Sequence, residues 1–585
     1  MDHPMRTHCA GSLDASSTGQ AVRLAGWVHS RRDHGGVYFF DLRDRSGLVQ
    51  VVVHPEKAEA FLATAKLGSE WVVSVKGVVG LRPKGSENPK MPTGAIEISA
   101  DSVTVLNTCK VLPFEVDEHS SACEETRLKY RFLDLRRARM LRNLTTRHAV
   151  SMAARSALAA EGFLEIETPL LTKATPEGAR DFLVPSRLNP GSFYALPQSP
   201  QIFKQILMVA GVEKYFQLAR AFRDEDLRAD RQPEHTQIDV EMSFVREEDV
   251  HAVAERMMKV IFKEALGQDL KTPFPRLDYL DAMRRFGSDK PDQRYGLEIV
   301  DLSAELKTCG FKVFAGAIAE GGVVRAISCE TSCSRSEIGK LTDLAKTHGA
   351  KGLAWIKWTA SGPETPILKF LTPAELKAIK TKTGAGAGMH TFFAADKEIA
   401  AATVLGAIRK ELILKTKPQS STPWHFCWIT SFPLLEWAPE EKRWTFAHNP
   451  FTAPLEEEAA KLDSDPGTVR SHQYDLVLNG VELASGSIRN HRGEMQRKIL
   501  GLMGFDDSEQ QRLFGLLLSA LDFGAPPHGG FAVGLDRLCA LLCGEDSIRE
   551  VIAFPKTQKG ADPLSEAPGP VRERQLKDLH IKLDL

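Results

Sequence analysis

Short apolar runs, interrupted by Gly, Asp and Pro, dominate residues 1–108. The runs are VRLAGWVHSRR, GVYFFDLRDRSG, LVQVVVHP, EWVVSVKGVVGLRP and GAIEISADSVTVL, and their β-branched and aromatic residues favour strands. One segment, 56–66, has helical spacing instead. Because five strands with a single helical insert are typical of an OB-type barrel, the pattern predicts an all-β domain over 1–108.

The next strong pattern surrounds a highly charged stretch, FRDEDLRADRQPEHTQIDVE (222–241). The apolar run 215–219 leads into it, and IDVEM (238–242) follows with alternating apolar and acidic residues, which predicts a half-buried strand. Two strands would then flank a loop that contains both basic and acidic residues. This loop would either clamp an anion or be an ordinary solvated hairpin tip. The residues of the clamp would be Arg223, Glu225, Arg228, Asp230 and Arg231.

Helical periods and chain breakers organise the region that follows the barrel. Helical spacing over 142–161 ends at Gly162, and the next segment, 163–169, is a predicted strand that ends on a proline. A second amphipathic helix is predicted over 247–266. Near the end of the chain, the dipeptide Asn479-Gly480 between two apolar runs predicts a hairpin.

Residues 288–418 differ in character from their surroundings. They alternate between strand and helix patterns and contain a small-residue turn, KTGAGAGMH, which lacks the GK[ST] ending of a phosphate-binding loop and is therefore interpreted as a plain turn. We interpret this segment as an inserted α/β module in a multidomain α+β chain. The predicted limits are 1–108 for the barrel, 109–140 for a hinge, 141–287 and 419–560 for the two parts of the main domain, 288–418 for the insertion and 561–585 for a C-terminal extension.

Composition restricts the class of protein. With 585 residues, 43% hydrophobic and 26% charged, the chain is an ordinary globular protein too long for one core. Its net charge of −1 excludes a global basic field, so a nucleic-acid surface would have to be local. We expect a cytoplasmic protein, neither secreted nor membrane-spanning, because the N-terminus lacks an apolar region and no run of about 18 apolar residues occurs.

The nine cysteines are scattered along the chain. Two pairs, Cys329/Cys333 and Cys539/Cys543, have C-x3-C spacing, which fits neighbours on a helix better than a zinc site. We therefore predict free, reduced thiols, which agrees with a cytoplasmic location.

Basic and aromatic residues are interleaved within the predicted barrel. Arginines that hold phosphates beside rings that stack on bases would suit single-stranded nucleic acid. The equally weighted alternative places the phenylalanines in the core and the arginines on a solvated rim. The residues concerned are Arg31, Arg32, Arg43, Arg45, Tyr38, Phe39 and Phe40.

Several stretches together resemble a known family. TPLLTKATPEGARDF, FRDED…RQPEHTQID and GGFAVGLDRL are similar to motifs 1, 2 and 3 of the class II aminoacyl-tRNA synthetases. QSPQIFKQ and NGVELASGSIR resemble the corresponding stretches of bacterial-type aspartyl-tRNA synthetases. The barrel resembles that family's anticodon-binding domain, and 288–418 stands where the family carries its GAD insertion. The resemblance covers nearly the whole chain, with the five motifs in the family's order.

The resemblance implies a two-step ligase reaction that uses ATP and Mg²⁺. Aspartate and ATP would give aspartyl-adenylate and pyrophosphate, and the aspartyl group would pass to the 3′ end of tRNA. By resemblance, Arg223 contacts the α-phosphate and Arg537 the γ-phosphate, where fixed cations stabilise developing charge. Glu482 and Asp475 would hold Mg²⁺, since hard cations take carboxylate ligands. The predicted catalytic residues are Arg223, Glu482 and Arg537, and the ATP site adds Asp224, Glu225, Gln232, Gly534, Leu535 and Asp536.

The implied amino-acid site must distinguish aspartate from the nearly isosteric asparagine. Two cations on the side-chain carboxylate would reject the neutral amide, because their charges would be left uncompensated. By resemblance Lys204 and Arg489 form this clamp, with Asp239 offsetting their charge; the ordinary alternatives are a surface lysine and a strand-edge arginine. Glu177 and Gln201 would hold the ammonium group, with Arg223 beside them, and His448 would close over the substrate, unless it is an ordinary core or surface histidine.

The resemblance also implies which tRNAs are recognised. Arg32, Phe39 and Gln50 fall where the family binds anticodon bases. His34 and Gly85 are similar to variants that accept both tRNA(Asp) and tRNA(Asn). We therefore predict a non-discriminating enzyme, which forms a homodimer through motif 1.

Three alternatives stay open at this point: a discriminating enzyme for tRNA(Asp) only, a related asparagine or lysine enzyme, and a non-catalytic tRNA-binding paralogue. Two cations at the substrate side chain argue against asparagine and lysine. A non-catalytic paralogue is expected to have lost Arg223, Glu482 or Arg537, and all three are present. One departure is His235, which stands where the family often has Phe.

Overall fold

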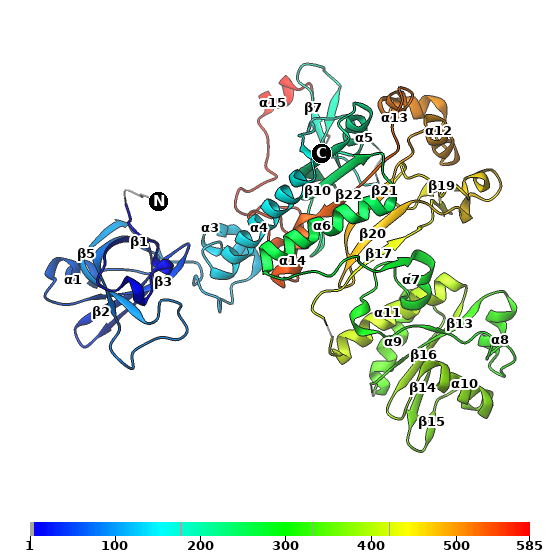
Figure 1. Ribbon diagram of the computed structural model, residues 1–585, viewed down its shortest axis with the longest axis horizontal. Helices are drawn as coiled ribbons and strands as arrows, with labels where there is room; N and C mark the ends of the chain where they lie inside the picture. Colours follow the sequence, from blue (N-terminus) through cyan, green and yellow to red (C-terminus); the bar gives the residue numbers. More distant parts are fainter. Residues whose placement is uncertain (1–4, 176–177, 332, 421, 585) are drawn as a thin grey trace. The chain divides into compact units, whose positions relative to one another are not determined.

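The computed structural model describes residues 5–175, 178–331, 333–420 and 422–584, coloured along the chain in Figure 1. Contacts within the chain define two compact units. The first comprises Met1–His148, Leu227–Gln232 and Cys539–Arg572. The second comprises Ala149–Asp226, Pro233–Leu538 and Glu573–Leu585.

The first unit contains a closed five-stranded barrel in the order β1-β2-β3-β5-β4. Alternate residues along the strands, such as Val22, Leu24 and Phe40, point inward and form one core. The five strands and the single helical insert that the sequence pattern predicts are both present. Their bounds are β1 (Ala21–His34), β2 (Val37–Asp44), β3 (Gly47–Val53), α1 (Ala58–Ala65), β4 (Val72–Leu81) and β5 (Ile96–Asn107).

A buried arginine organises the rest of the first unit. Arg131, in α3 (Arg131–Asp134), pairs with Asp134 at 2.6 Å and donates to the backbone carbonyls of Arg549, Ile552 and Ala553. Because the guanidinium is 2% exposed and satisfied on several sides, it ties the segment after the barrel to the distant C-terminal segment. The short helix α2 (Glu124–Lys129) precedes it.

The second unit is built on an eight-stranded sheet, in the order β11-β17-β20-β21-β22-β10-β9-β6 (Figure 1). All neighbours are antiparallel except the edge pairs β6 with β9 and β11 with β17. The bounds are β6 (Leu164–Glu165), β9 (Lys214–Phe222), β10 (Glu234–Ser243), β11 (Arg276–Asp278), β17 (Phe426–Thr430), β20 (Gln473–Leu478), β21 (Val481–Ile488) and β22 (His528–Gly534).

Several local predictions hold in this sheet. Two strands flank the charged loop, helix α6 (Glu247–Leu266) has the predicted limits, and Asn479 and Gly480 turn β20 into β21 with φ of 52° and 80°. The strand predicted over 163–169 is shorter, because only Leu164 and Glu165 form the edge strand β6, which pairs with β9.

Strand β10 differs from the half-buried strand that its alternation predicts. Asp239 and Glu241, on its polar face, are only 1% and 0% exposed. Helix α5 (Gln201–Val209) packs against β10 and supplies Lys204, which pairs with Asp239, while Arg489 from further along the chain pairs with Glu241. Alternation reveals that the two faces differ in polarity, but not that a polar face is covered.

The insertion forms its own five-stranded sheet, β12-β13-β16-β14-β15, within the second unit. Helices α9 and α11 pack on one face and α8 and α10 on the other, each over a separate core (Figure 1). The predicted α/β module is present, and the glycine-rich turn joins α10 to β16. The bounds are β12 (Val300–Asp301), α8 (Lys312–Ala319), β13 (Val323–Cys329), α9 (Arg335–Thr347), β14 (Ala354–Thr359), β15 (Gly362–Glu364), α10 (Pro373–Thr383), β16 (His390–Asp396) and α11 (Glu398–Thr416).

The remaining α-helices and β-strands complete the chain. They are α4 (Ala138–Ala160), β7 (Leu183–Pro185), β8 (Phe193–Ala195), α7 (Tyr279–Phe286), β18 (Leu435–Ala438), β19 (Arg443–Phe446), α12 (Gly493–Leu502), α13 (Asp507–Leu521), α14 (Leu535–Cys543) and α15 (Glu573–Asp578). Within the described ranges, no helix combines the length and apolar character needed to cross a membrane.

All nine cysteines are free thiols, as predicted. Cys539 and Cys543 are neighbours on α14, but Cys329 ends strand β13 and Cys333 precedes α9. The expectation of helix neighbours is therefore wrong for the first pair, because a spacing of four residues also spans a strand–helix junction.

Candidate active site

Four charged side chains form a buried group on the polar face of β10. Lys204, on α5, places its Nζ 2.8 Å from Asp239 Oδ1 and 3.3 Å from Glu241 Oε2. Arg489, which directly follows β21, donates from Nε and Nη2 to the two carboxylate oxygens of Glu241 at 3.0 and 3.1 Å. Each of the four is at most 3% exposed. The structure thus brings together Lys204, Asp239 and Arg489, as predicted, and adds Glu241.

Glu241 is the residue of this group that the sequence interpretation did not assign. The signal for it was available: it stands two residues from Asp239 on the same strand, so both point to one face. Its bidentate contact with Arg489 joins residues 248 positions apart, and Arg489 Nη1 donates to Ser487 Oγ at 2.7 Å. Glu241 therefore links the two cations that would recognise the substrate.

The two buried carboxyl groups differ in how readily they ionise. Burial raises the pKa of Asp239, an effect that the Lys204 ammonium only partly offsets. Burial also disfavours ionisation of Glu241, but Arg489 and Lys204 together hold its pKa below the usual value. Glu241 is therefore the stable anion of the group, and Asp239 is the carboxyl group that takes up a proton more easily.

A second pair of cations, Arg223 and Arg537, lies around His235. Arg223 follows β9, and its backbone N–H donates to the Pro233 carbonyl at 2.8 Å, which closes the hairpin. Arg537, on α14, donates from Nη1 to the backbone carbonyl of Glu482 and lies 3.8 Å from its carboxylate. Burial lowers the pKa of His235 to about 4, and both arginines add to this. The two arginines thus act on one neutral imidazole from different elements.

Arg223 has an open donor. Its Nε is buried and has no hydrogen-bond partner among the described residues. An N–H group buried in this way is costly unless an acceptor is supplied, so it points to an anionic ligand.

The strand–helix junction of motif 3 holds the four consecutive residues from Gly534 to Arg537. Leu535 is 2% exposed and packs in the interior, while Asp536 Oδ2 accepts the Thr236 backbone N–H at 2.9 Å. A Cβ atom at Gly534 would lie 3.6 Å from the Cβ of Arg537. The junction therefore places Arg537 rigidly beside β10; the ATP roles of Gly534, Leu535 and Asp536 stay predictions.

Two carboxylates, Asp475 on β20 and Glu482 on β21, lie near His448. Burial raises the pKa of Asp475 to about 6, with His448 opposing this shift and Glu482 adding to it. The Glu482 side chain is 36% exposed and lies 3.7 Å from Lys290 Nζ. Asp475 and Glu482 are thus close enough to repel each other, which a cation between them would relieve. His448 packs edge-on against another ring in the interior, with a centroid distance of 4.5 Å.

Two residues predicted to hold the substrate ammonium group have different outcomes. Gln201 is 8% exposed at the start of α5, one turn before Lys204, and its amide donates to Gln205 at 3.0 Å. Glu177 lies outside the described residues. The position of Gln201 is compatible with its predicted role, which stays a prediction.

The remaining ATP-site candidates are spread over the hairpin loop. Asp224 is exposed, and its backbone N–H donates to the Arg180 carbonyl at 3.1 Å; Glu225 is half-buried. Gln232 belongs to the first compact unit, where its amide forms bonds of 3.1 and 2.7 Å with the backbone of Lys556. The role of Gln232 toward ATP stays a prediction.

On the barrel, Arg32, Phe39 and Gln50 gather on one outer face. Arg32 and Phe39 are register partners on β1 and β2, and Arg32 Nη2 donates to Gln50 Oε1 at 3.4 Å. Phe40 points into the core with 0% exposure, whereas Phe39 is half-buried on the outside. The core alternative is therefore right for Phe40, because neighbouring residues of a strand face opposite ways. Base stacking on Phe39 stays a prediction.

Other basic residues of the barrel serve its structure. Arg43 pairs with Glu70 at 2.6 Å, and Arg31 donates to the carbonyl of Thr64 at 3.2 Å. His34 is the last residue of β1, and Gly85 lies in the loop after β4 with φ of 90°, a conformation that favours glycine. Both are exposed.

Comparison with known proteins places these features in a family. Residues 123–558 match the family described as tRNA synthetases class II (D, K and N), and residues 22–106 match the OB-fold nucleic acid binding domain. The chain belongs to the class II tRNA synthetases. It is therefore an aminoacyl-tRNA synthetase, an enzyme class that uses ATP as a substrate, with an OB-fold domain at the N-terminal end of the sequence.

Relatives of this synthetase cover its whole length. A protein of Elusimicrobium minutum named Aspartate--tRNA(Asp/Asn) ligase is 55% identical over 583 residues, 99% of this chain and 100% of the relative. A protein of Aquifex aeolicus with the same name is 52% identical, over 99% of this chain and 98% of the relative.

Solved structures share the fold at lower identity. The asparaginyl-tRNA synthetase of Pyrococcus horikoshii, complexed with asparaginyl-adenylate, has a TM-score of 0.59 and 20% identity, covering 93% of this chain and 96% of that chain. The aspartyl tRNA synthetase of Entamoeba histolytica has a TM-score of 0.55 and 19% identity, covering 93% and 90%. At this identity the likeness establishes the fold alone.

Proposed function

We propose that this synthetase is an aspartate–tRNA ligase that activates L-aspartate with ATP and transfers it to tRNA(Asp) and tRNA(Asn). The observation that carries the proposal is the buried group of Lys204, Arg489, Asp239 and Glu241. Two cations fixed at one position suit an acidic side chain, and the name shared by the relatives agrees with this choice. The roles proposed for individual residues are those that the resemblance implies.

In the activation step, the aspartate α-carboxylate attacks the α-phosphate of ATP and pyrophosphate leaves. The substrate carboxylate is already ionised, so no general base is needed. The open Nε donor of Arg223 supports its role at the α-phosphate, and Arg537 would hold the γ-phosphate end. Positioning and charge stabilisation account for the rate in this mechanism.

Asp475 and Glu482 fit a site for Mg²⁺. Burial raises the pKa of Asp475 and the charge of Glu482 adds to this, and a divalent cation would favour the ionised form. Mg²⁺ commonly binds one or two protein carboxylates together with substrate phosphates. Within the described part of the chain, no cluster of three or more metal-ligating side chains occurs. When bound, the ion would neutralise phosphate charge. These two residues would orient it from neighbouring strands.

The buried group explains how asparagine is rejected. Glu241 stays ionised between Arg489 and Lys204, whereas Asp239 protonates more easily. An incoming side-chain carboxylate would compete with Asp239 for Lys204 and use the remaining donors of the Arg489 fork. A neutral side-chain amide cannot replace Asp239 as the anion beside Lys204. The ion pairs within the group therefore stay as they are, and the amide gains little binding free energy.

The barrel would bind the anticodon through Arg32, Phe39 and Gln50, with residues 1–108 as the anticodon-binding domain. His34, at the end of β1, and Gly85, in the loop after β4, are both exposed and are proposed to allow both tRNAs. The two anticodons differ at one base, so a few loop residues suffice to decide between them. The competing candidate is an enzyme restricted to tRNA(Asp).

The test is aminoacylation of purified tRNA(Asp) and tRNA(Asn) side by side, with ATP–pyrophosphate exchange for each amino acid. Exchange with aspartate alone and charging of both tRNAs are expected. A His34→Leu enzyme should lose charging of tRNA(Asn) more than of tRNA(Asp). Equal loss on both tRNAs would remove the role of His34, and exchange with asparagine or lysine would overturn the substrate assignment.

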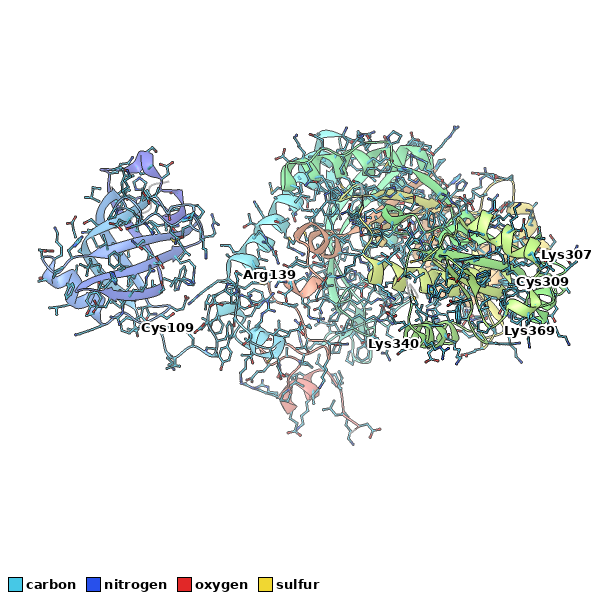
Figure 2. All side chains as sticks on the ribbon, turned by 90° about the horizontal axis from the view of Figure 1, so that it is seen from below. Cys109, Arg139, Lys307, Cys309, Lys340 and Lys369 are labelled. Carbon is cyan, nitrogen blue, oxygen red and sulfur yellow. The ribbon has the colours of Figure 1, made fainter. Side chains whose placement is uncertain are left out.

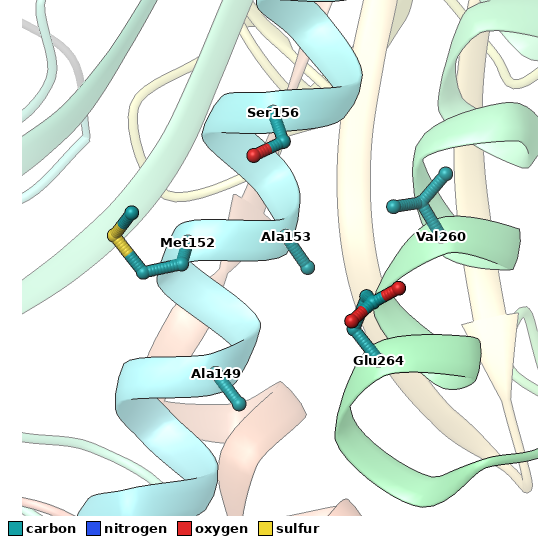
Figure 3. Close-up of a pocket in the computed structure, with 6 residues that line it drawn as sticks. All are labelled: Ala149, Met152, Ala153, Ser156, Val260 and Glu264. Carbon is teal, nitrogen blue, oxygen red and sulfur yellow. The ribbon is translucent and has the colours of Figure 1, made fainter.

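We also propose a homodimer and a cytoplasmic location, where tRNA is aminoacylated for protein synthesis. Apolar side chains on and after α4 are exposed: Met152, Leu164, Leu170 and Leu171 are 46–56% exposed. A hollow of about 400 Å³ between α4 and α6 would take up a partner side chain (Figure 3). It is lined by Ala149, Met152, Ala153, Ser156, Val260 and Glu264. Light scattering should give twice the chain mass of 64.6 kDa; a single mass would contradict the dimer.

A further inference from the structure

The insertion carries a surface that the aminoacylation chemistry does not use. Two segments distant in sequence, 307–313 and 367–371, meet on the side of its sheet that α8 and α10 cover. The Gly310 N–H donates to the Phe370 carbonyl at 3.1 Å, and a Cβ atom at Gly310 would lie only 3.1 Å from that oxygen. The missing side chain of Gly310 thus allows the two segments to close on each other.

Aromatic and aliphatic side chains are exposed where these segments meet. The rings of Phe311 and Phe370 lie 5.8 Å apart at 34°. Phe370 is 37% exposed, and Leu368 and Val313 are 41% and 57% exposed. Single exposed apolar residues are ordinary, but several at one junction indicate a contact surface.

Three lysines belong to the same two segments. Lys307, Lys312 and Lys369 are exposed, and Lys369 Nζ lies 4.9 Å from the centre of the Phe370 ring. Within the described ranges none of the three forms an ion pair, whereas the nearby Lys382 pairs with Glu305 at 2.8 Å. Lys307 and Lys369 lie at the same end of the insertion, away from Lys340 (Figure 2). We call these three lysines, Phe311 and Phe370 the 307–370 patch.

We infer that the 307–370 patch binds a single-stranded segment of tRNA, with phosphates on the lysines and an unstacked base on Phe370. Cations around an exposed ring suit nucleic acid because every nucleotide offers both a negative charge and a flat face. An acidic peptide would satisfy the lysines but leave the ring without a matching partner. The choice of tRNA rests on the proposed function.

The experiment compares two matched triple substitutions in the full-length enzyme. Lys307→Gln/Lys312→Gln/Lys369→Gln removes the charges of the patch. The control, Lys340→Gln/Lys346→Gln/Lys351→Gln, removes three exposed charges on α9 and the loop after it, which pack on the opposite face of the sheet. A third variant, Phe370→Leu, keeps the apolar volume and removes the aromatic ring.

Aspartate-dependent ATP–pyrophosphate exchange without tRNA is expected to be unchanged in all three variants. The patch triple should raise the KM for tRNA about tenfold at physiological salt, and the dependence of log KM on log salt should be less steep by about 2. Phe370→Leu should raise the KM about fivefold with an unchanged salt slope. The salt slope separates lost phosphate contacts from a structural effect.

Equal KM values and salt slopes for the patch and control triples would overturn the inference. The same result would be obtained if the patch served a protein partner. If the wild-type enzyme gave no exchange with aspartate, the proposed function would fail separately. Direct binding of unfractionated tRNA by the same variants would then still test the patch.

Discussion

The two pairs of cations in the catalytic sheet contrast in how their charge is compensated. Lys204 and Arg489 are 2% and 3% exposed, and protein carboxylates already contact both. Arg223 and the Arg537 side chain, which is 28% exposed, lie at the ends of elements, and Arg223 keeps a buried donor without a partner in the described structure. The first pair is balanced before any ligand binds, whereas Arg223 of the second pair still has a donor for a phosphate.

This difference follows from where each pair is held. A charge buried among packed elements must be paired to avoid a desolvation cost of several kcal/mol. A charge at the end of a strand or the start of a helix is only partly buried, so it does not depend on a fully buried carboxylate partner. We therefore expect substitutions of the buried pair to reduce both substrate recognition and stability. Substitutions of the half-exposed pair should reduce catalysis alone.

The largest expected effect is that of Lys204→Ala. It leaves two carboxyl groups buried beside a single cation, so the free energy of unfolding should fall by about 3–5 kcal/mol. Aspartate-dependent exchange should fall to background. Chemical denaturation and ATP–pyrophosphate exchange measure the two effects.

Two further variants separate recognition from folding. Lys204→Arg keeps the charge, so it should recover most of the stability while exchange stays low, because the bulkier group misplaces the donor. Lys259→Ala, at an exposed position on α6, should change neither quantity. A well-folded Lys204→Ala enzyme with wild-type exchange would move the substrate clamp elsewhere.

Arg223→Ala tests the other pair. Exchange should fall by about 10²–10³-fold, since one donor to the developing charge is lost. The free energy of unfolding should stay within about 0.5 kcal/mol of the wild type, because the arginine has no buried carboxylate partner in the described structure. The matched control is Arg180→Ala, which removes a side chain that is 80% exposed and lies 3.7 Å from Asp224. This substitution should change neither exchange nor the free energy of unfolding. A loss of stability as large as that of Lys204→Ala would erase the contrast between the pairs.

The smallest expected effect concerns His235 and pH. Its folded-state pKa of about 4 lies below the ordinary value of 6.5, because burial and then Arg223 disfavour its charge. The unfolded chain therefore binds more protons, so the stability that His235 contributes is present above pH 6.5 and is lost as pH falls toward 4.

His235→Phe removes this loss. Relative to the wild type, the variant should gain about 2.5 kcal/mol between pH 7.5 and pH 4.5, measured by urea denaturation at each pH. Equal pH dependence in both proteins would show that neither burial nor the arginines disfavour the charged form of this ring.

Local patterns were sufficient to predict much of the fold. The strands of the barrel, the limits of α6, the Asn479-Gly480 hairpin and the strand–helix junction before Arg537 all depend on residues close together in the sequence. The motifs also pointed to Lys204, Asp239 and Arg489, which the structure brings together. Where a prediction failed, as for the strand at 163–169, the outcome depended on how many residues could pair with β9, which lies further along the chain.

The sequence by itself determined which segments become strands and helices, and where charge and aromatic rings are concentrated, because these properties repeat over a few residues. Only the tertiary structure decided that the acidic face of β10 is buried and that Glu241 meets Arg489 from 248 positions away. It also decided that Phe40 rather than Phe39 faces the core of the barrel and that Gly310 meets Phe370. Such contacts depend on packing between elements, which the spacing of residues along one segment does not record.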